Sequence, residues 1–102
     1  MIKIFQINKD RDKNNVAFMA YDWLEEFDFS IYDEVWSGKT PYKWKTLEGI
    51  FEIFNLFHPE NFHGHSLSVS DIVQIVEPDT DDVTEEAGYY YCDRFGWKKL
   101  EL

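Results

Sequence analysis

Hydrophobic and polar residues follow one another along the chain in patterns that predict a series of short strands. Residues 2–7 alternate between apolar and polar side chains, as in a strand with one buried face. Further apolar runs bounded by polar or turn-forming residues predict strands at 16–19, 31–36, 71–76, 88–95 and 97–102. The last two runs read as a strand pair that turns at Phe95-Gly96.

The apolar spacing also predicts two helices. The clearer one covers residues 46–57, with Thr46 as its N-cap and Pro59 beyond its end. Its buried face has the i, i+3, i+4, i+7 spacing and consists of Leu47, Ile50, Phe51 and Phe54. A shorter helix is predicted at 20–27, with an apolar face of Trp23, Leu24 and Phe27. The expected fold is therefore α+β, a mostly antiparallel sheet of about five to six strands with both helices packed on it.

Composition and charge narrow the class of partner. A chain of 102 residues suits a single domain, here expected over 1–102, and its 20 acidic and 10 basic side chains give a net charge of -10. Such a charge repels phosphate backbones and anionic lipid, so we expect no direct nucleic-acid binding and no membrane association. Cys92 is the only cysteine, which excludes an intrachain disulfide. The first residues do not form a signal peptide, and we expect a cytoplasmic location.

Several segments, in order, resemble one known family. The segment 47–55 leads into His58-Pro59-Glu60-Asn61-Phe62, and then into residues 64–73, which read GHSLSVSDIV. Residues 90–97 follow with YYCDRFGW, and residues 4–7 and 18–24 supply an opening strand and an "F..YD.L" segment. This order resembles the YodL-like family, with its "FN..HP.DF.GHSLSVSD.V" stretch and later "YY.D..GF". The resemblance implies a small α/β module of Gram-positive bacteria and their mobile genetic elements, and it implies no particular reaction.

Two clusters of residues bear on catalysis or metal binding. The spacing of His58, His63 and His65 can suit zinc or copper, but no cysteine lies nearby to complete a structural site. The second cluster combines His65 with Asp71 and three serines, namely Ser66, Ser68 and Ser70. Triad members normally come from separate segments, whereas Ser and Asp in one loop commonly bond nearby backbone N–H groups and set a turn. We therefore expect no enzyme, no catalytic residue, no metal and no cofactor.

An acidic connection at 77–87 is longer than in the family pattern. It carries six carboxylates, namely Glu77, Asp79, Asp81, Asp82, Glu85 and Glu86. A calcium loop is excluded because Thr84 and Val83 stand where an EF-hand needs glycine and an oxygen ligand. The connection is either a solvated loop or a surface that engages a basic patch on a partner. A second acidic patch is predicted from Asp22, Glu25 and Glu26.

Two hypotheses for function follow. The first is a non-enzymatic inhibitor of a host defence nuclease, of the anti-CRISPR or anti-restriction type, which binds an RNA-guided nuclease or restriction enzyme as a partial nucleic-acid mimic. The alternative is a regulatory module that binds a host protein through aromatic and apolar surface, independently of the acidic loop. Consecutive tyrosines at 89–91 must face alternate sides of a strand, and we expect Tyr90 to contribute to binding. The sequence does not determine the oligomeric state.

Overall fold

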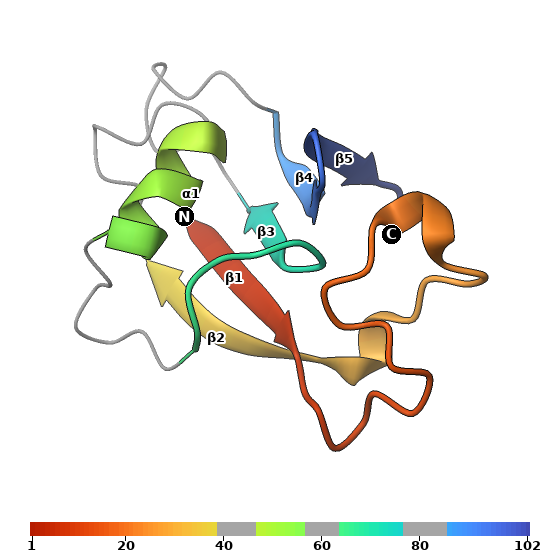
Figure 1. The fold of residues 1–102 in the computed structure, drawn as a ribbon. Coiled ribbons are helices and arrows are strands. Elements are labelled where there is room, and N and C mark those ends of the chain that lie inside the picture. Colours follow the sequence, from red (N-terminus) through yellow and green to blue (C-terminus); the bar gives the residue numbers. More distant parts are fainter. Residues whose placement is uncertain (39–46, 57–63, 77–85) are drawn as a thin grey trace.

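The computed structural model describes residues 1–38, 47–56, 64–76 and 86–102. Within these ranges the fold is mostly β, an antiparallel sheet of five strands with one short α-helix and two single turns of 3-10 helix (Figure 1). The strands are β1 (Ile2–Ile7), β2 (Tyr32–Gly38), β3 (Ile72–Ile75), β4 (Gly88–Asp93) and β5 (Gly96–Leu100). The helical elements are α1 (Leu47–Leu56), η1 (Tyr21–Trp23) and η2 (Phe29–Ile31). None of the helices in the described ranges has the length and apolarity that a membrane span requires.

The sheet has the strand order β2-β1-β3-β4-β5, and every neighbouring pair is antiparallel. β1 is therefore an inner strand, and its register pairs Ile2 with Ile75 of β3. The pairing of β1 with β2 shifts between Ile4 and Phe5, which marks a bulge or a local irregularity. The sheet brings the first strand of the chain beside β3, which lies about seventy positions later in the sequence.

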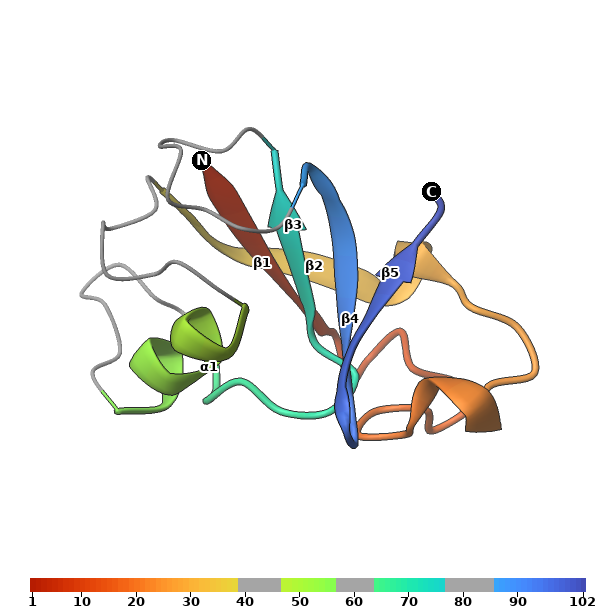
Figure 2. The same ribbon diagram turned by 90° about the horizontal axis from the view of Figure 1, so that it is seen from above.

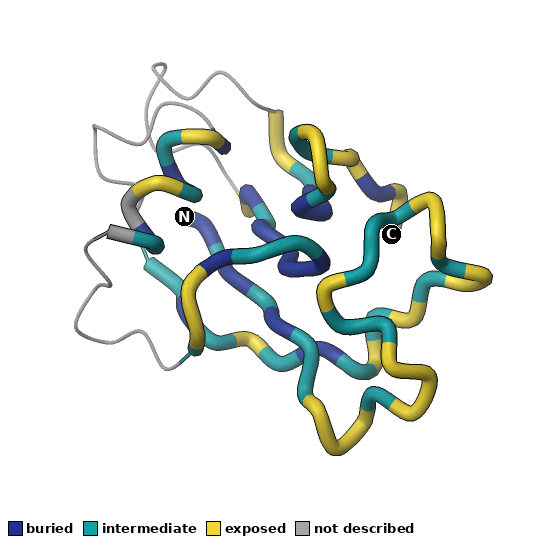
Figure 3. The backbone as a smooth tube through the Cα atoms, viewed as in Figure 1, coloured by how far each residue is buried: buried dark blue, intermediate teal, exposed yellow. Residues whose placement is uncertain are grey.

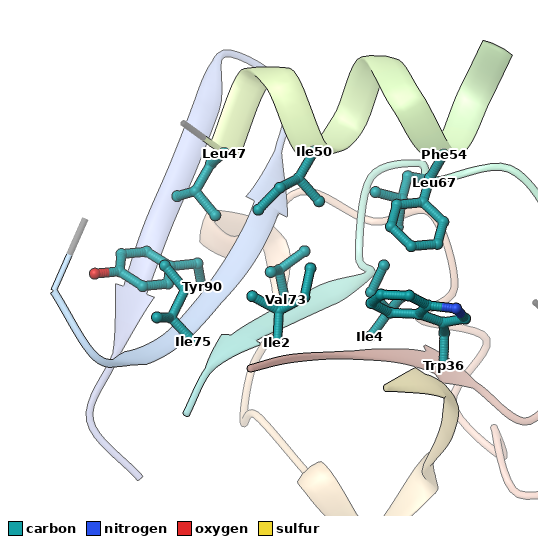
Figure 4. Close-up of a cluster of buried hydrophobic side chains, with 10 residues drawn as sticks. All are labelled: Ile2, Ile4, Trp36, Leu47, Ile50, Phe54, Leu67, Val73, Ile75 and Tyr90. Atoms are coloured by element: carbon teal, nitrogen blue, oxygen red, sulfur yellow. The ribbon is translucent and has the colours of Figure 1, made fainter. Parts of the chain in front are cut away.

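The two faces of the sheet carry separate apolar clusters, because successive side chains of a strand point to opposite sides. Figure 2 shows α1 on one side of the sheet and residues 21–31 on the other. Figure 4 shows the cluster beneath α1, which consists of Ile2, Ile4, Trp36, Leu47, Ile50, Phe54, Leu67, Val73, Ile75 and Tyr90. The opposite cluster has Tyr32, Ile72, Tyr91 and Leu100 at its centre, with partly buried Phe5, Ile7, Tyr21, Leu24, Phe27, Phe29, Ile31 and Tyr89 packed against it. Figure 3 shows the resulting burial along the strands.

The prediction of a helix at 20–27 is wrong. η1 covers only three residues, and Leu24 ends it with an extended backbone at φ −76° and ψ 133°. Ala20 at the start provides no side-chain cap, so an α-helix there lacks a common source of stabilisation. Leu24 and Phe27 still pack on the sheet, whereas Trp23 points outward with 71% of its surface exposed. The predicted apolar face is therefore split between core and surface.

The strand predicted at 16–19 is also absent, and these residues form a turn. The Asp12 carboxylate accepts hydrogen bonds from the backbone N–H groups of Val16 and Ala17, at 2.9 and 3.0 Å. Phe18 has φ +66°, which lies in the left-handed region and is incompatible with a strand. The Asp12 carboxylate thus satisfies backbone N–H groups that would pair with a neighbouring strand if this segment were itself a strand.

The remaining differences concern element boundaries. α1 has ten residues and is shorter than the helix predicted at 46–57, whose first and last positions lie outside the described residues. Leu47, Ile50 and Phe54 are buried, as expected. The β4–β5 pair turns at residues 94–95, one position earlier than predicted, because Asp93 pairs with Gly96.

Candidate protein-binding surface

Three large aromatic side chains are exposed at the end of the sheet where β4 turns into β5. Phe95 is 95% exposed, Trp23 71% and Phe18 57%. Isolated exposed apolar side chains are common, but contiguous ones at pockets mark interaction sites. We call this region the Trp23 surface, and it consists of Phe18, Met19, Trp23, Arg94 and Phe95 with Asp22, Glu25 and Glu26 at its border.

Trp23 joins three open pockets into this one surface. The first, of about 330 Å³, lies between η1 and the β4–β5 turn and is lined by Trp23, Phe95 and Trp97 among others. The second, of about 270 Å³, is lined by Phe18, Met19, Ala20, Trp23 and Arg94. The third, of about 510 Å³, continues past Trp23 and Met19 to Glu25 and Glu26. Trp23 lines all three pockets, so a bound segment at any of them would contact its indole.

The β4–β5 turn positions Arg94 and Phe95. Asp93 at its first position and Gly96 at its fourth suit a tight turn, and Gly96 has φ +115°, which a glycine adopts without strain. The Asp93 carboxylate accepts hydrogen bonds from the N–H groups of Arg94 and Tyr21, at 2.8 and 3.3 Å. The second bond ties η1 to the turn. The Arg94 guanidinium lies 5.8 Å from the centre of the Phe95 ring, within the range of a cation–π contact.

Phe18 is held in a strained conformation by Ser70. Both residues have positive φ, +66° and +85°, although neither is a glycine. The buried Ser70 Oγ accepts a hydrogen bond from the Phe18 N–H at 2.9 Å. Ser70 is itself fixed, because its N–H donates to the Cys92 carbonyl at 2.9 Å and its carbonyl accepts from the Tyr32 hydroxyl at 2.6 Å. Strained non-glycine residues collect at functional sites, and here the strain presents an aromatic ring to solvent.

The residue next to Phe18 is fixed from the same side of the sheet. The Tyr91 hydroxyl donates a hydrogen bond to the Met19 carbonyl. Burial raises the pKa of both the Tyr91 and the Tyr32 hydroxyls above their ordinary value, so both remain protonated donors at neutral pH. Burial likewise raises the pKa of the Cys92 thiol to about 12, which keeps it an unreactive thiol.

A buried polar cluster lies directly behind Ser70. The Asp71 carboxylate accepts hydrogen bonds from the Gln6 amide at 3.0 Å and from the Ser68 N–H at 2.9 Å. Gln6, itself buried, also donates to the His65 carbonyl at 2.8 Å and accepts from the His65 N–H at 3.1 Å. Burial raises the pKa of Asp71 to about 7. The His65 ring lies half-exposed with its centre 5.8 Å from that of Phe18, and its Nδ1 is 4.0 Å from the carboxylate.

This geometry supports the structural interpretation of the serine-rich segment. Asp71 and Ser70 bond backbone N–H groups, as expected for residues that set a turn. His65 is close to Asp71, but its Nδ1 contacts the Ser66 carbonyl at 2.7 Å, and the Asp71 oxygen near it already accepts two hydrogen bonds. The cluster therefore positions backbone, and its half-exposed member borders the Trp23 surface.

Comparison with family models matches residues 1–102 to the YodL-like domain. The chain belongs to the YodL-like domain family. No curated protein and no solved structure matches it. The residues that hold Phe18 and the turn of this YodL-like domain come from the "GHSLSVSD" and "YYCDRFG" segments, which carry the resemblance.

The predicted binding residues of this YodL-like domain have different outcomes. Glu77, Asp79, Asp81, Asp82 and Glu85 lie outside the described residues. Glu86 is described, and its exposed carboxylate forms an ion pair with Lys99 at 3.2 Å. The second predicted acidic patch, Asp22, Glu25 and Glu26, is exposed and borders the pockets at Trp23.

The structure buries Tyr90, and its contribution to binding stays a prediction. Tyr90 belongs to the cluster beneath α1 and is only 6% exposed. Its hydroxyl donates a hydrogen bond to the Glu86 carbonyl at 2.7 Å. Both neighbours, Tyr89 and Tyr91, face the other side of the sheet, where residues 21–31 cover much of them.

Two of the three histidines considered for metal binding, His58 and His63, lie outside the described residues. Within the described ranges no group of three or more His, Cys, Asp or Glu side chains is placed to hold a metal ion. The expectation of no metal thus stays a prediction.

The sequence pattern does not identify Phe18 or Phe95 as residues of the Trp23 surface, nor Gln6 as a member of the buried polar cluster. Phe95 could have been found, because a turn residue between paired strands is normally exposed. The apolar run at 16–19 predicts a strand for Phe18, and nothing in the local pattern marks its positive φ. Gln6 lies on the same face of β1 as Ile2 and Ile4, which is buried. A polar side chain at a buried position needs a hydrogen-bond partner, so its place in the alternation could have indicated the polar cluster.

Proposed function

We propose that this YodL-like domain is a non-enzymatic module of the bacterial cytoplasm that binds a partner protein through the Trp23 surface. The observation that carries the proposal is the exposure of Trp23 at the junction of three pockets, between the exposed Phe18 and Phe95. Tryptophan and arginine are over-represented among residues that dominate binding energy, and both are present here. The strain and hydrogen bonds that hold Phe18 give the surface a fixed shape before binding, which reduces the entropy lost on association.

The test compares Trp23→Ala with Leu102→Ala. Leu102 is an exposed apolar residue that lines none of the three pockets, so it controls for the general loss of apolar surface. Proteins captured from host lysate by the unchanged chain are identified and purified, and their affinity is measured by titration calorimetry. We expect Trp23→Ala to weaken binding by at least about tenfold and Leu102→Ala to leave it unchanged. Equal affinity for both variants would show that the partner binds elsewhere.

The charge of the chain supports a second candidate function, inhibition of a host defence nuclease of the anti-CRISPR or anti-restriction type. A net charge of -10 and the acidic connection at 77–87 favour a partner with a basic, nucleic-acid-binding groove. The carboxylates of the acidic connection would then occupy the positions that the phosphates of the nucleic acid occupy in the groove of the nuclease.

Charge reversal separates the two candidates. If the acidic segment binds, replacing its aspartates and glutamates by lysines should reduce co-purification with an RNA-guided nuclease or restriction subunit at least about threefold. Prior loading of the nuclease with guide or DNA should reduce it too. An unchanged yield after charge reversal would exclude mimicry by this segment, and Trp23→Ala would then decide whether the Trp23 surface is used.

A further inference from the structure

The carboxylates beside Trp23 differ from those of Asp33, Glu34 and Glu86 in having no partner among the described residues. Glu34 pairs with Lys3 at 3.1 Å, Glu86 pairs with Lys99 at 3.2 Å, and Asp33 pairs with Arg11. In contrast, the side chains of Asp22, Glu25 and Glu26 are exposed and form no hydrogen bond or ion pair within the described part of the chain.

These carboxylates also line two of the pockets at Trp23. Asp22 lines the pocket between η1 and the β4–β5 turn, and Glu25 and Glu26 line another pocket that also includes Trp23. Of the described residues that line the three pockets, Arg94 alone is cationic. Its guanidinium lies 5.8 Å from the centre of the Phe95 ring, and Arg94 does not line the pocket that Glu25 and Glu26 line. The surface therefore combines exposed aromatic rings with an excess of negative charge.

We infer that the Trp23 surface binds a segment of a partner protein in which an apolar side chain lies next to lysine or arginine. This inference rests on the proposed function and adds the chemistry of the partner. The apolar side chain would occupy a pocket against Trp23 and Phe95, where burial of apolar area drives association. The adjacent cations would pair with Asp22, Glu25 and Glu26, and one of them can lie over the indole face, which attracts cations most strongly among the aromatic side chains.

Charge argues against two other occupants. An acidic segment would meet like charge at the border of the pockets, which costs free energy. A second copy bound by a two-fold axis would bring the same carboxylates of both chains together at one interface. A basic and apolar segment of a different protein is the partner that satisfies both features of the surface.

The experiment is selection of peptides from a random displayed library on the immobilised full-length chain at low salt. We expect the enriched peptides to carry lysine or arginine beside leucine, phenylalanine or tryptophan. A selected peptide should bind at least about tenfold more weakly to Trp23→Ala. It should bind at least about threefold more weakly to the triple variant Asp22→Asn, Glu25→Gln, Glu26→Gln, which removes charge and preserves size. Leu102→Ala should bind like the unchanged chain.

The possible outcomes of the peptide selection distinguish a failure of this inference from a failure of the proposed function. Peptides that depend on Trp23 but lack a basic excess, or that ignore the triple variant, would overturn the inference and leave the proposed function standing. Peptides that bind Trp23→Ala as well as the unchanged chain, or a selection without enrichment, would overturn both.

Discussion

Replacing Asp71 by alanine should lower the free energy of unfolding by about 2–4 kcal/mol, whereas asparagine should leave the domain at least as stable at about pH 8. Alanine removes the acceptor for the Gln6 amide and the Ser68 N–H, and it leaves a void at a side chain that is 1% exposed. Asparagine keeps one carbonyl oxygen for both donors and removes the cost of a buried charge. Urea denaturation of the three proteins, with matched m-values, measures the difference.

The pH dependence has a definite sign. Burial raises the pKa of Asp71 from 3.8 to about 7 in the folded chain, so the folded state binds a proton more tightly than the unfolded state. The stability that this carboxyl contributes is fully present below about pH 4 and is lost as the pH rises to about 7. The amide that Asp71→Asn introduces does not titrate, so the difference between the unchanged chain and this variant isolates the Asp71 carboxyl from the other carboxylates. A difference that stays constant between about pH 4 and 8 would contradict the expected burial of charge.

The sheet could be predicted from the sequence wherever one face of a strand is buried. The alternation at Ile2–Ile7 requires Ile2 and Ile4 on one side and Phe5 on the other, and the structure has this arrangement. The helical spacing after Thr46 similarly places Ile50 in the core. In both segments the local pattern and the packing agree, which is the condition under which sequence patterns succeed.

The Trp23 surface could be predicted only in part, because distant contacts determine it. The acidic border at Asp22, Glu25 and Glu26 was expected, since charges at a surface need no particular partner. The apolar spacing predicts Trp23 on a buried helical face, but η1 ends at Leu24 and Trp23 is exposed. The conformation of Phe18 depends on a serine 52 positions later, which no local window contains.

Replacing Ser70 by alanine should lower the free energy of unfolding by about 2 kcal/mol and release Phe18 from its strained conformation. Alanine has no oxygen for the Phe18 N–H, and it keeps the strain of a non-glycine residue at φ +85°. The loss of this hydrogen bond removes what holds Phe18 at φ +66°, so the turn should relax toward ordinary backbone angles. Urea denaturation measures the first effect, and amide hydrogen exchange at Phe18 measures the second.

Ser70→Gly separates the hydrogen bond from the backbone strain. Glycine also lacks the hydroxyl, but it adopts positive φ freely, so this variant should be about 1 kcal/mol less destabilised than Ser70→Ala. Both variants should lose protection of the Phe18 amide to the same extent, because both lose the same acceptor. Partner binding at the Trp23 surface should weaken in both, since a Phe18 that must be ordered on binding adds an entropic cost. Full protection of the Phe18 amide in either variant would show that the turn is held by other contacts, and Ser70 would then have no part in shaping the surface.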